Sequence, residues 1–177
     1  MHISHKMNSV VDPPEVVVFG CGNVLFGDDG FGPAVIEVLS RQGLPPSVRL
    51  IDAGGAIREY LLDLLLLPAS RPALLLLVDA AHDEGEAPGA VRERDPADMD
   101  AAKIHDYSLH QFPTVNLLRA LAEETGMAVR LVTAQAATIP DRPQVGLSPA
   151  MTAAVEAACA MILRTLACHA VAEATGP

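Results

Sequence analysis

The chain has 177 residues, half of them apolar and only 3% aromatic, and its formal net charge is −10. This length corresponds to one domain of roughly 100–200 residues, which can bury about 70% of its unfolded surface without disulfides or metals. The chain has twelve lysines and arginines and 22 acidic residues. This balance argues against a protein that binds the phosphate backbone of nucleic acids. We therefore expect a single globular domain and a monomer, with a neutral or cationic molecule or a metal ion as its ligand.

Cysteine usage and the N-terminus both favour the cytoplasm. The sequence contains three scattered cysteines and no CxxC pair: Cys21, Cys159 and Cys168. Residues 1–15 are polar, include two prolines and lack the apolar region of a signal peptide, so we expect a flexible tail there. The leucine-rich runs at 61–67 and 74–78 are much shorter than the about 20 apolar residues of a membrane-spanning helix.

Short apolar runs alternate with helical patterns in the first half of the chain. Continuous apolar runs predict buried strands at 16–19 and 74–78, and residues 48–51 predict a further strand between them. Apolar residues at helical spacing predict a helix that begins near Asp28 and ends before Gly43. A second helix is predicted from Ile57 until Pro68.

The second half continues this alternation. A short edge strand is predicted around Val91, and a strand at 129–133. Between them, the capping-box spacing of Ser108 and Gln111 predicts a helix that ends at Gly126. Ser148-Pro149 predicts the start of the last helix, with residues 171–177 as a flexible end.

The order of elements predicts an α/β fold. We expect a three-layer αβα sandwich over residues 16–170, with a mostly parallel twisted sheet of about five strands and helices on both faces. Ligands of such sheets bind beyond the carboxyl ends of the strands. Functional residues are therefore expected in four loops, at 20–29, 52–55, 79–82 and 133–146.

The glycine loop after the first strand does not fit a dinucleotide. Leu25 stands where the GxGxxG fingerprint requires its third glycine. Asp28 and Asp29 stand at the start of the following helix, where their charges would repel a pyrophosphate. A nucleotide-binding module is therefore disfavoured. Cys21 in this loop is interpreted as a small packing residue in preference to a nucleophile, and the sequence contains neither GxSxG nor HExxH.

Two acids and a histidine form the candidate metal-binding set. Asp79 directly follows the third predicted strand, so it would share a crevice with Asp29 if the first and third strands are neighbours. Carboxylates brought together need a cation or a proton between them. His110 is the favoured third group, ahead of His82 and His105, and such a set suits Zn, Ni, Fe or Co. Asp52, after the second strand, is either a turn residue or a further acid at this edge.

The loop from Gly20 to Gly32, GCGNVLFGDDGFG, resembles the GxGNxLxxDDGxG signature of the hydrogenase maturation endopeptidases. Further likeness lies in the strand that ends at Asp79, in residues 108–111 and in residues 145–149, so that it covers about 16–166. The chain departs from the family pattern where Asp29 replaces a frequent Glu, Leu109 replaces a proline, and Gly55 replaces a small hydroxyl residue.

The resemblance implies an aspartic-type endopeptidase of the cytoplasm. Its partner would be the precursor of a nickel–iron hydrogenase large subunit, from which it would remove a C-terminal extension after nickel insertion. By position, Asp29, Asp79 and His110 correspond to the family's metal-binding residues and would recognise nickel supplied by the substrate. Zn or Cd would occupy the same site in vitro. Whether the metal serves recognition or catalysis stays open, and a water molecule is the expected nucleophile.

A phospho-receiver signalling domain is the alternative. It would bind Mg²⁺ and use Asp79 as the phosphoacceptor, with Thr133 at the end of a later strand. Such domains need a lysine after the last strand, whereas the two lysines here are Lys6 and Lys103. The acid pair also lies about nine residues beyond the first strand, which is too far along for a receiver.

Overall fold

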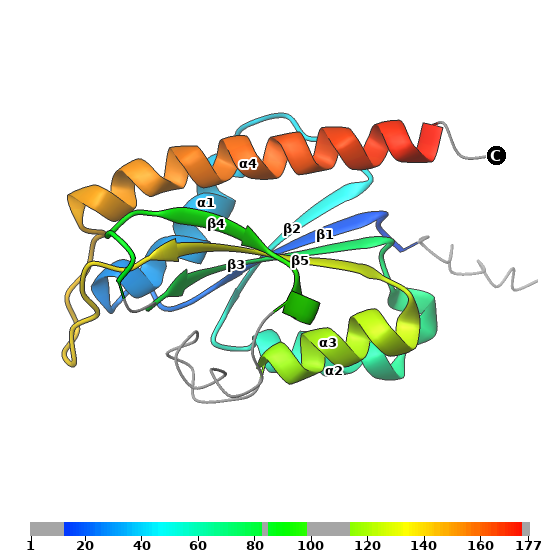
Figure 1. Ribbon diagram of the computed structural model, residues 1–177, viewed down its shortest axis with the longest axis horizontal. Helices are drawn as coiled ribbons and strands as arrows, with labels where there is room; N and C mark the ends of the chain where they lie inside the picture. Colours follow the sequence, from blue (N-terminus) through cyan, green and yellow to red (C-terminus); the bar gives the residue numbers. More distant parts are fainter. Residues whose placement is uncertain (1–12, 83–84, 99–113, 175–177) are drawn as a thin grey trace, which may run out of the picture.

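A five-stranded sheet lies between two layers of helices in the computed structural model, which describes residues 13–82, 85–98 and 114–174 (Figure 1). The strand order is β2-β1-β3-β5-β4. The parallel strands are β1 (Val16–Cys21), β2 (Val48–Gly54), β3 (Leu74–Ala81) and β5 (Ala128–Gln135). The edge strand β4 (Val91–Arg94) is antiparallel to β5. The predicted α/β fold with a mostly parallel sheet is confirmed.

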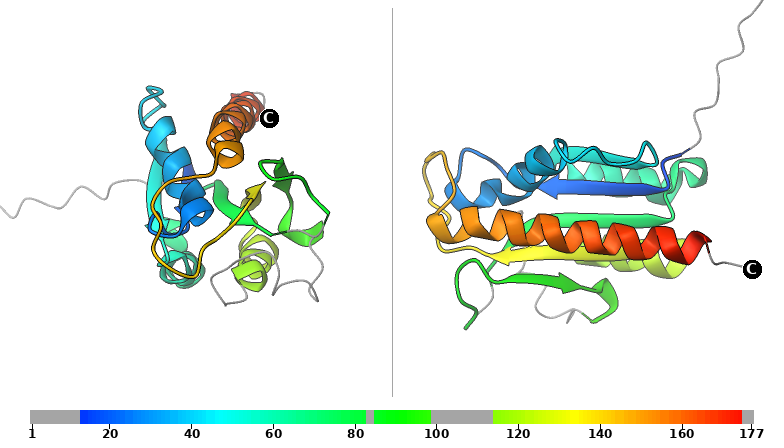
Figure 2. Two further views of the ribbon diagram at one scale, coloured as in Figure 1. Left: turned by 90° about the vertical axis from the view of Figure 1, so that its left-hand side faces the viewer. Right: turned by 90° about the horizontal axis from the view of Figure 1, so that it is seen from above.

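Helices cover both faces of the sheet, as predicted (Figure 2). One face carries α1 (Phe31–Leu39) and α4 (Pro149–Ala174), and the other carries α2 (Ile57–Leu66) and α3 (Thr114–Thr125). Three short 3-10 helices complete the described elements: η1 (Gly27–Gly30), η2 (Pro68–Ser70) and η3 (Pro96–Asp98).

Side chains of the central strands alternate between two separate hydrophobic cores. In β1, Val16 and Val18 pack toward α1 and α4, whereas Val17, Phe19 and Cys21 pack toward α2 and α3. Strand β3 follows the same alternation, with its even-numbered residues in the first core and Leu75 and Leu77 in the second. The period of two therefore places the side chain of Asp79 on the α2/α3 side of the sheet.

Strand β3 is longer than the sequence predicts. Its predicted end at Val78 rested on the charge of Asp79, but β3 continues to Ala81, and Asp79 pairs with Thr133 of β5. The pairing of β3 with β1 ends at Val78, but its ladder with β5 continues through Asp79 to Ala81, because the backbone pairs whatever the side chain. Asp79 thus lies within the strand and not after it, which corrects the prediction.

Two glycines let α1 lie directly on the backbone of β1. A Cβ at Gly32 would stand 2.2 Å from the carbonyl oxygen of Cys21, and one at Gly20 would stand 2.6 Å from the carbonyl oxygen of Gly32. No larger residue fits at either position without moving the helix. This close approach fixes η1, which carries both acids of the glycine loop, against the carboxyl end of β1.

The last helix begins as the sequence predicts. The Ser148 hydroxyl accepts a hydrogen bond from the N–H of Met151 at 3.3 Å, and Pro149 is the first helical residue. The helix continues to Ala174, four residues beyond the expected end of the domain at 170. By length and composition α4 could span a bilayer, but it packs on the sheet and on α1, as the core helix of a globular domain does.

Candidate functional site

The candidate site lies where the strand order changes direction. The chain passes from β1 outward to β2 and then returns across β1 to β3, so that β1 and β3 are neighbours. Ligands of open α/β sheets bind outside the carboxyl ends of the strands at this point. The prediction that β1 and β3 lie side by side is therefore confirmed.

Asp29 is held at this edge by the glycine loop. It lies in η1 and is buried, and its Oδ2 accepts a hydrogen bond from the N–H of Asn23 at 2.8 Å. Gly22 has a φ of +116°, and a Cβ there would stand 1.8 Å from the carbonyl oxygen of Asp29. Glycine is required at this position because the loop both turns in the left-handed region and touches the acid's own backbone.

Asp79 lies on the neighbouring strand β3, close enough for the charge of Asp29 to act on it. Its side chain is buried, and its Oδ1 accepts a hydrogen bond from the N–H of Ala80 at 2.8 Å. Burial, and to a lesser extent the negative charge of Asp29, raise the pKa of Asp79 from 3.8 to about 8, although the Ala80 hydrogen bond acts in the opposite direction. The structure thus brings these two predicted residues together as a pair that favours a proton or a cation.

The raised pKa of Asp79 predicts a specific dependence of stability on pH. Between its ordinary pKa of 3.8 in the unfolded chain and about 8 in the folded one, the folded protein binds more protons. The free energy of unfolding of the metal-free protein should therefore fall as pH rises from about 4 to about 8, by up to about 1.4 kcal/mol per pH unit. Asp79→Asn should remove this part of the slope, which urea unfolding in the presence of a chelator measures. An unchanged slope in the variant would contradict the assignment.

Asp28, the neighbour of Asp29, has a different role. It is 1% exposed and accepts three backbone N–H groups: Ala137 at 2.8 Å, Thr138 at 3.1 Å and Ser148 at 2.6 Å. Its carboxylate therefore ties η1 to both ends of the segment between β5 and α4. The sequence motif singled out both acids but contained no signal for this long-range contact.

Cys21 and Asp52 serve local structure at this edge. Cys21 is buried in the α2/α3 core, where burial and then the charges of Asp79, Asp29 and Asp52 raise its pKa well above the ordinary value. A raised pKa keeps the thiol protonated, which favours the packing role over that of a nucleophile. Asp52 is exposed, and its Oδ1 accepts the N–H of Gly54 at 3.1 Å, as a turn residue does.

Polar residues of β5 extend the site in a way that the sequence did not reveal. Thr133 and Gln135 are buried, and Thr133 stands directly beside Asp79 in the sheet. Arg94 of β4 donates from Nε to the Thr133 hydroxyl at 3.3 Å. Thr133 was noted only for the receiver alternative, and nothing in the pattern of Gln135 or Arg94 marks either of them.

The histidine of the predicted set is not placed. His110 and His105 lie outside the described residues, and His82 follows β3 directly and is exposed. Within the residues that the structure describes, no group of three or more potential metal ligands comes together. The two carboxylates fit a divalent cation by their burial and mutual repulsion, and the third ligand stays a prediction.

Comparisons with known proteins agree with this architecture. A family model described as hydrogenase maturation protease matches residues 33–165. The chain belongs to the hydrogenase maturation protease family. The Escherichia coli hydrogenase 2 maturation protease is 31% identical over 154 residues, which cover 85% of this chain and 90% of that protein.

Solved structures of this family share the fold. The chain resembles the hydrogenase maturating endopeptidase HybD from E. coli with a TM-score of 0.67 at 28% identity, covering 86% of this chain and 91% of that one. The maturation protease HycI from Thermococcus kodakarensis gives a TM-score of 0.65 at 26% identity, covering 84% and 90%. The chain is thus an endopeptidase of the hydrogenase maturation protease family, and the receiver alternative is set aside.

Proposed function

We propose that this maturation protease removes the C-terminal extension from the precursor of a nickel–iron hydrogenase large subunit, in the cytoplasm, after nickel has been inserted. It recognises the substrate's nickel through Asp29, Asp79 and His110. The observation that carries the proposal is the buried pair Asp29 and Asp79, where the second acid has a pKa of about 8.

The pair supports recognition of a metal that arrives with the substrate. Without a cation, Asp79 keeps its proton, because burial and the charge of Asp29 disfavour a second carboxylate. A divalent ion brought by the precursor offsets both charges and releases that proton. A nickel-free precursor offers no such compensation and should bind weakly.

A water molecule is the nucleophile that best fits the site. Cys21 is the only cysteine that the described structure places beside the acid pair, and its thiol is buried and protonated at neutral pH. The metal can have one of two roles in this proposal. It either only holds the precursor in place, or it also polarises the scissile carbonyl as a Lewis acid, and experiment separates the two.

The central experiment compares nickel-loaded and nickel-free precursor of a hydrogenase large subunit, incubated with purified protease. We expect the mass of the loaded subunit to fall by the mass of the extension, while the unloaded subunit stays intact. Equal cleavage of both would overturn the recognition role. Precursor loaded with Zn or Cd that binds but is not cleaved would show that the metal also takes part in catalysis.

Replacement of the acids tests the site itself. Asp79→Asn keeps the size of the side chain but removes its charge, so the rate of cleavage should fall by at least about 100-fold. This is more than is typical when a residue that only hydrogen-bonds to a metal ligand is replaced. Asp29→Ala and His110→Ala should have similar effects while circular dichroism stays unchanged. Asp141→Asn, at an exposed acid of the segment before α4, is the matched control. Calorimetric titration with Zn²⁺ or Cd²⁺ gives an activity-independent readout, and equal affinity of Asp79→Asn and the unchanged protein would contradict the assignment.

A further inference from the structure

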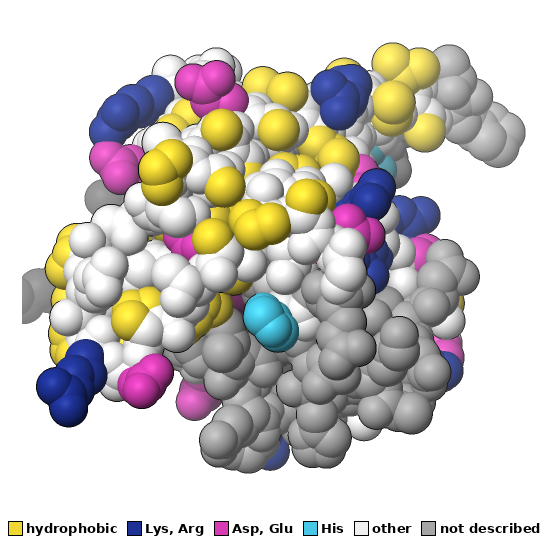
Figure 3. Space-filling view, turned by 60° about the vertical axis from the view of Figure 1, so that its left-hand side comes forward, with side chains coloured by type: hydrophobic (Ala, Val, Ile, Leu, Met, Phe, Trp, Pro, Cys, Tyr) yellow, Lys and Arg dark blue, Asp and Glu magenta, His cyan; other side chains and the backbone are white. Residues whose placement is uncertain are grey.

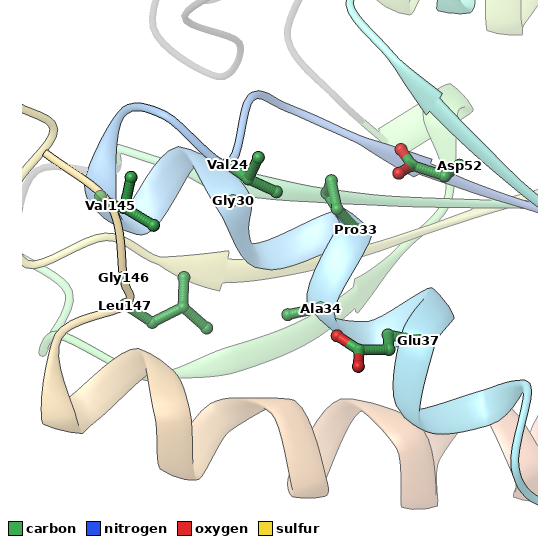
Figure 4. Close-up of a pocket in the computed structure, with 10 residues that line it drawn as sticks. Val24, Gly30, Pro33, Ala34, Glu37, Asp52, Val145, Gly146 and Leu147 are labelled. Carbon is green, nitrogen blue, oxygen red and sulfur yellow. The ribbon is translucent and has the colours of Figure 1, made fainter. Parts of the chain in front are cut away.

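A groove of about 400 Å³ lies between the segment from Val24 to α1 and the segment before α4 (Figure 4). Its walls come from the β1–α1 segment, including Val24 and Gly30, and from Val145–Leu147 before α4. Gly30 follows Asp29 in the chain, and the far end of the groove reaches Asp52. The groove therefore adjoins the loop that carries Asp29.

The rim of the groove exposes apolar side chains. Val24 is 51% exposed and Val145 is 75% exposed, and the neighbouring Leu25 is 47% exposed. In the close-up, Val24, Val145 and Leu147 stand around one space (Figure 4), and the space-filling view shows that hydrophobic side chains also gather on the surface of the molecule (Figure 3). A cluster of exposed apolar residues beside a cavity is typical of a surface that binds another molecule.

The two walls are fastened to each other. Phe26 and Gln144 form a parallel bridge, in which Gly27 donates to the carbonyl of Gln144 at 2.8 Å and Gln144 donates to that of Leu25 at 2.7 Å. Asp28 adds its three hydrogen bonds to the same segment. Because the groove is preformed, a ligand does not have to order its walls, which favours binding.

The far end of the groove is negatively charged. The carboxylates of Glu37 and Asp52 line it, and no lysine or arginine does so among the described residues. Glu37 of α1 forms an ion pair with Arg41, which follows the helix, but both side chains are about two-thirds exposed, so this pair is weak and exchangeable. No described arginine or histidine forms an ion pair with Asp52, so a cationic group of the ligand finds a partner there.

We propose that this groove binds a segment of the precursor's C-terminal extension that carries an apolar side chain and, two residues further on, a lysine or arginine. The inference rests on the proposed function, which supplies the peptide. In an extended chain, residues at positions i and i+2 project to the same side, so a peptide with this spacing presents both side chains to the groove. The net charge of −10 favours the approach of a cationic segment.

The first test uses fluorescein-labelled ten-residue peptides with a Gly-Ser background. One contains Val-Ser-Lys, a second contains Val-Ser-Glu and a third contains Ser-Ser-Lys. We expect the full chain to bind the first peptide at least about five times more tightly than either other peptide, by fluorescence anisotropy at low salt. Asp52→Asn should weaken binding of the first peptide by up to about fivefold, as expected for an exposed ion pair. Val145→Ser should remove its advantage over the Ser-Ser-Lys peptide.

Asp141→Asn is the matched control. Asp141 is an exposed acid of the segment between β5 and α4, which also contains Val145, but it does not line the groove. Equal binding of the three peptides, or an equal effect of Asp141→Asn and Asp52→Asn, would overturn the proposal. A dimer in sedimentation that Val145→Ser dissociates would overturn it too, because a second copy would then occupy the groove.

Cleavage of the nickel-loaded precursor separates this proposal from the proposed function. We expect Val145→Ser to raise KM several-fold with little change in kcat, because the groove binds a part of the substrate remote from the scissile bond. If Val145→Ser cleaved the loaded precursor normally and the three peptides bound equally well, the proposal for the groove would be overturned and the proposed function would stand. Discriminating peptide binding without cleavage of any loaded precursor would overturn the proposed function and the identity of the peptide, and leave only a peptide-binding groove.

Discussion

Asp28→Ala should cost about 3 kcal/mol or more of the free energy of unfolding, a large effect for a residue that lies outside the hydrophobic core. Its carboxylate accepts three backbone N–H groups in a site that is 1% exposed. Hydrogen bonds to a charged group contribute about 1.5–3 kcal/mol each, and a buried donor left unpaired adds its own desolvation penalty. Urea unfolding at pH 7 measures the change.

The amides that lose protection in Asp28→Ala distinguish a local effect from a general loss of stability. The three amides that Asp28 binds stand at the two ends of the segment between β5 and α4, and belong to Ala137, Thr138 and Ser148. In the variant these amides should lose protection from hydrogen exchange before the amides of the sheet do. Asp28→Asn should be intermediate, because its amide keeps one oxygen but replaces the other with a donor. Asp141→Ala, at an exposed position of this segment, should change stability by less than about 0.5 kcal/mol. Equal effects of Asp28→Ala and Asp141→Ala would contradict the role of Asp28.

The fold was largely predictable because its signals are local. Continuous apolar runs marked β1 and β3, the mostly apolar residues 48–51 marked β2, and the Ser148-Pro149 pair marked the start of α4. The end of β3 was not predictable in this way, since the pairing of Asp79 with Thr133 depends on a strand about 50 residues away. A charged residue ends a strand in a sequence pattern, but in the sheet its backbone pairs like any other.

The candidate site was predictable only in part. The topology rule placed Asp29 and Asp79 at one edge, because both follow or lie within neighbouring parallel strands. The roles of Asp28, Gln135 and Arg94 depend on contacts between segments that are distant in the chain, which no spacing encodes. The two aspartates of one dipeptide show this limit clearly: one faces the crevice, and the other ties two loops together.

Gly32→Ala should have the second large effect, because it tests whether the close approach of α1 to β1 positions the site. A Cβ at Gly32 would stand 2.2 Å from the carbonyl oxygen and 2.4 Å from the nitrogen of Cys21, both of them backbone atoms that cannot rotate away. Helix α1 must therefore move outward, at a cost of about 3 kcal/mol or more, the upper end for overpacked cores. Thermal unfolding by circular dichroism measures this loss.

The same movement should reach the acid pair. η1 leads directly into α1, so an outward shift of the helix carries Asp29 away from Asp79. Because the charge of Asp29 contributes to the raised pKa of Asp79, that pKa should fall in the variant, which carbon NMR of the Asp79 carboxyl follows during a pH titration. Gly55→Ala is the control, since a Cβ at Gly55 meets no atom within 4 Å. If Gly32→Ala lowered stability but left the pKa of Asp79 unchanged, the glycine contact would hold the helix without positioning the site.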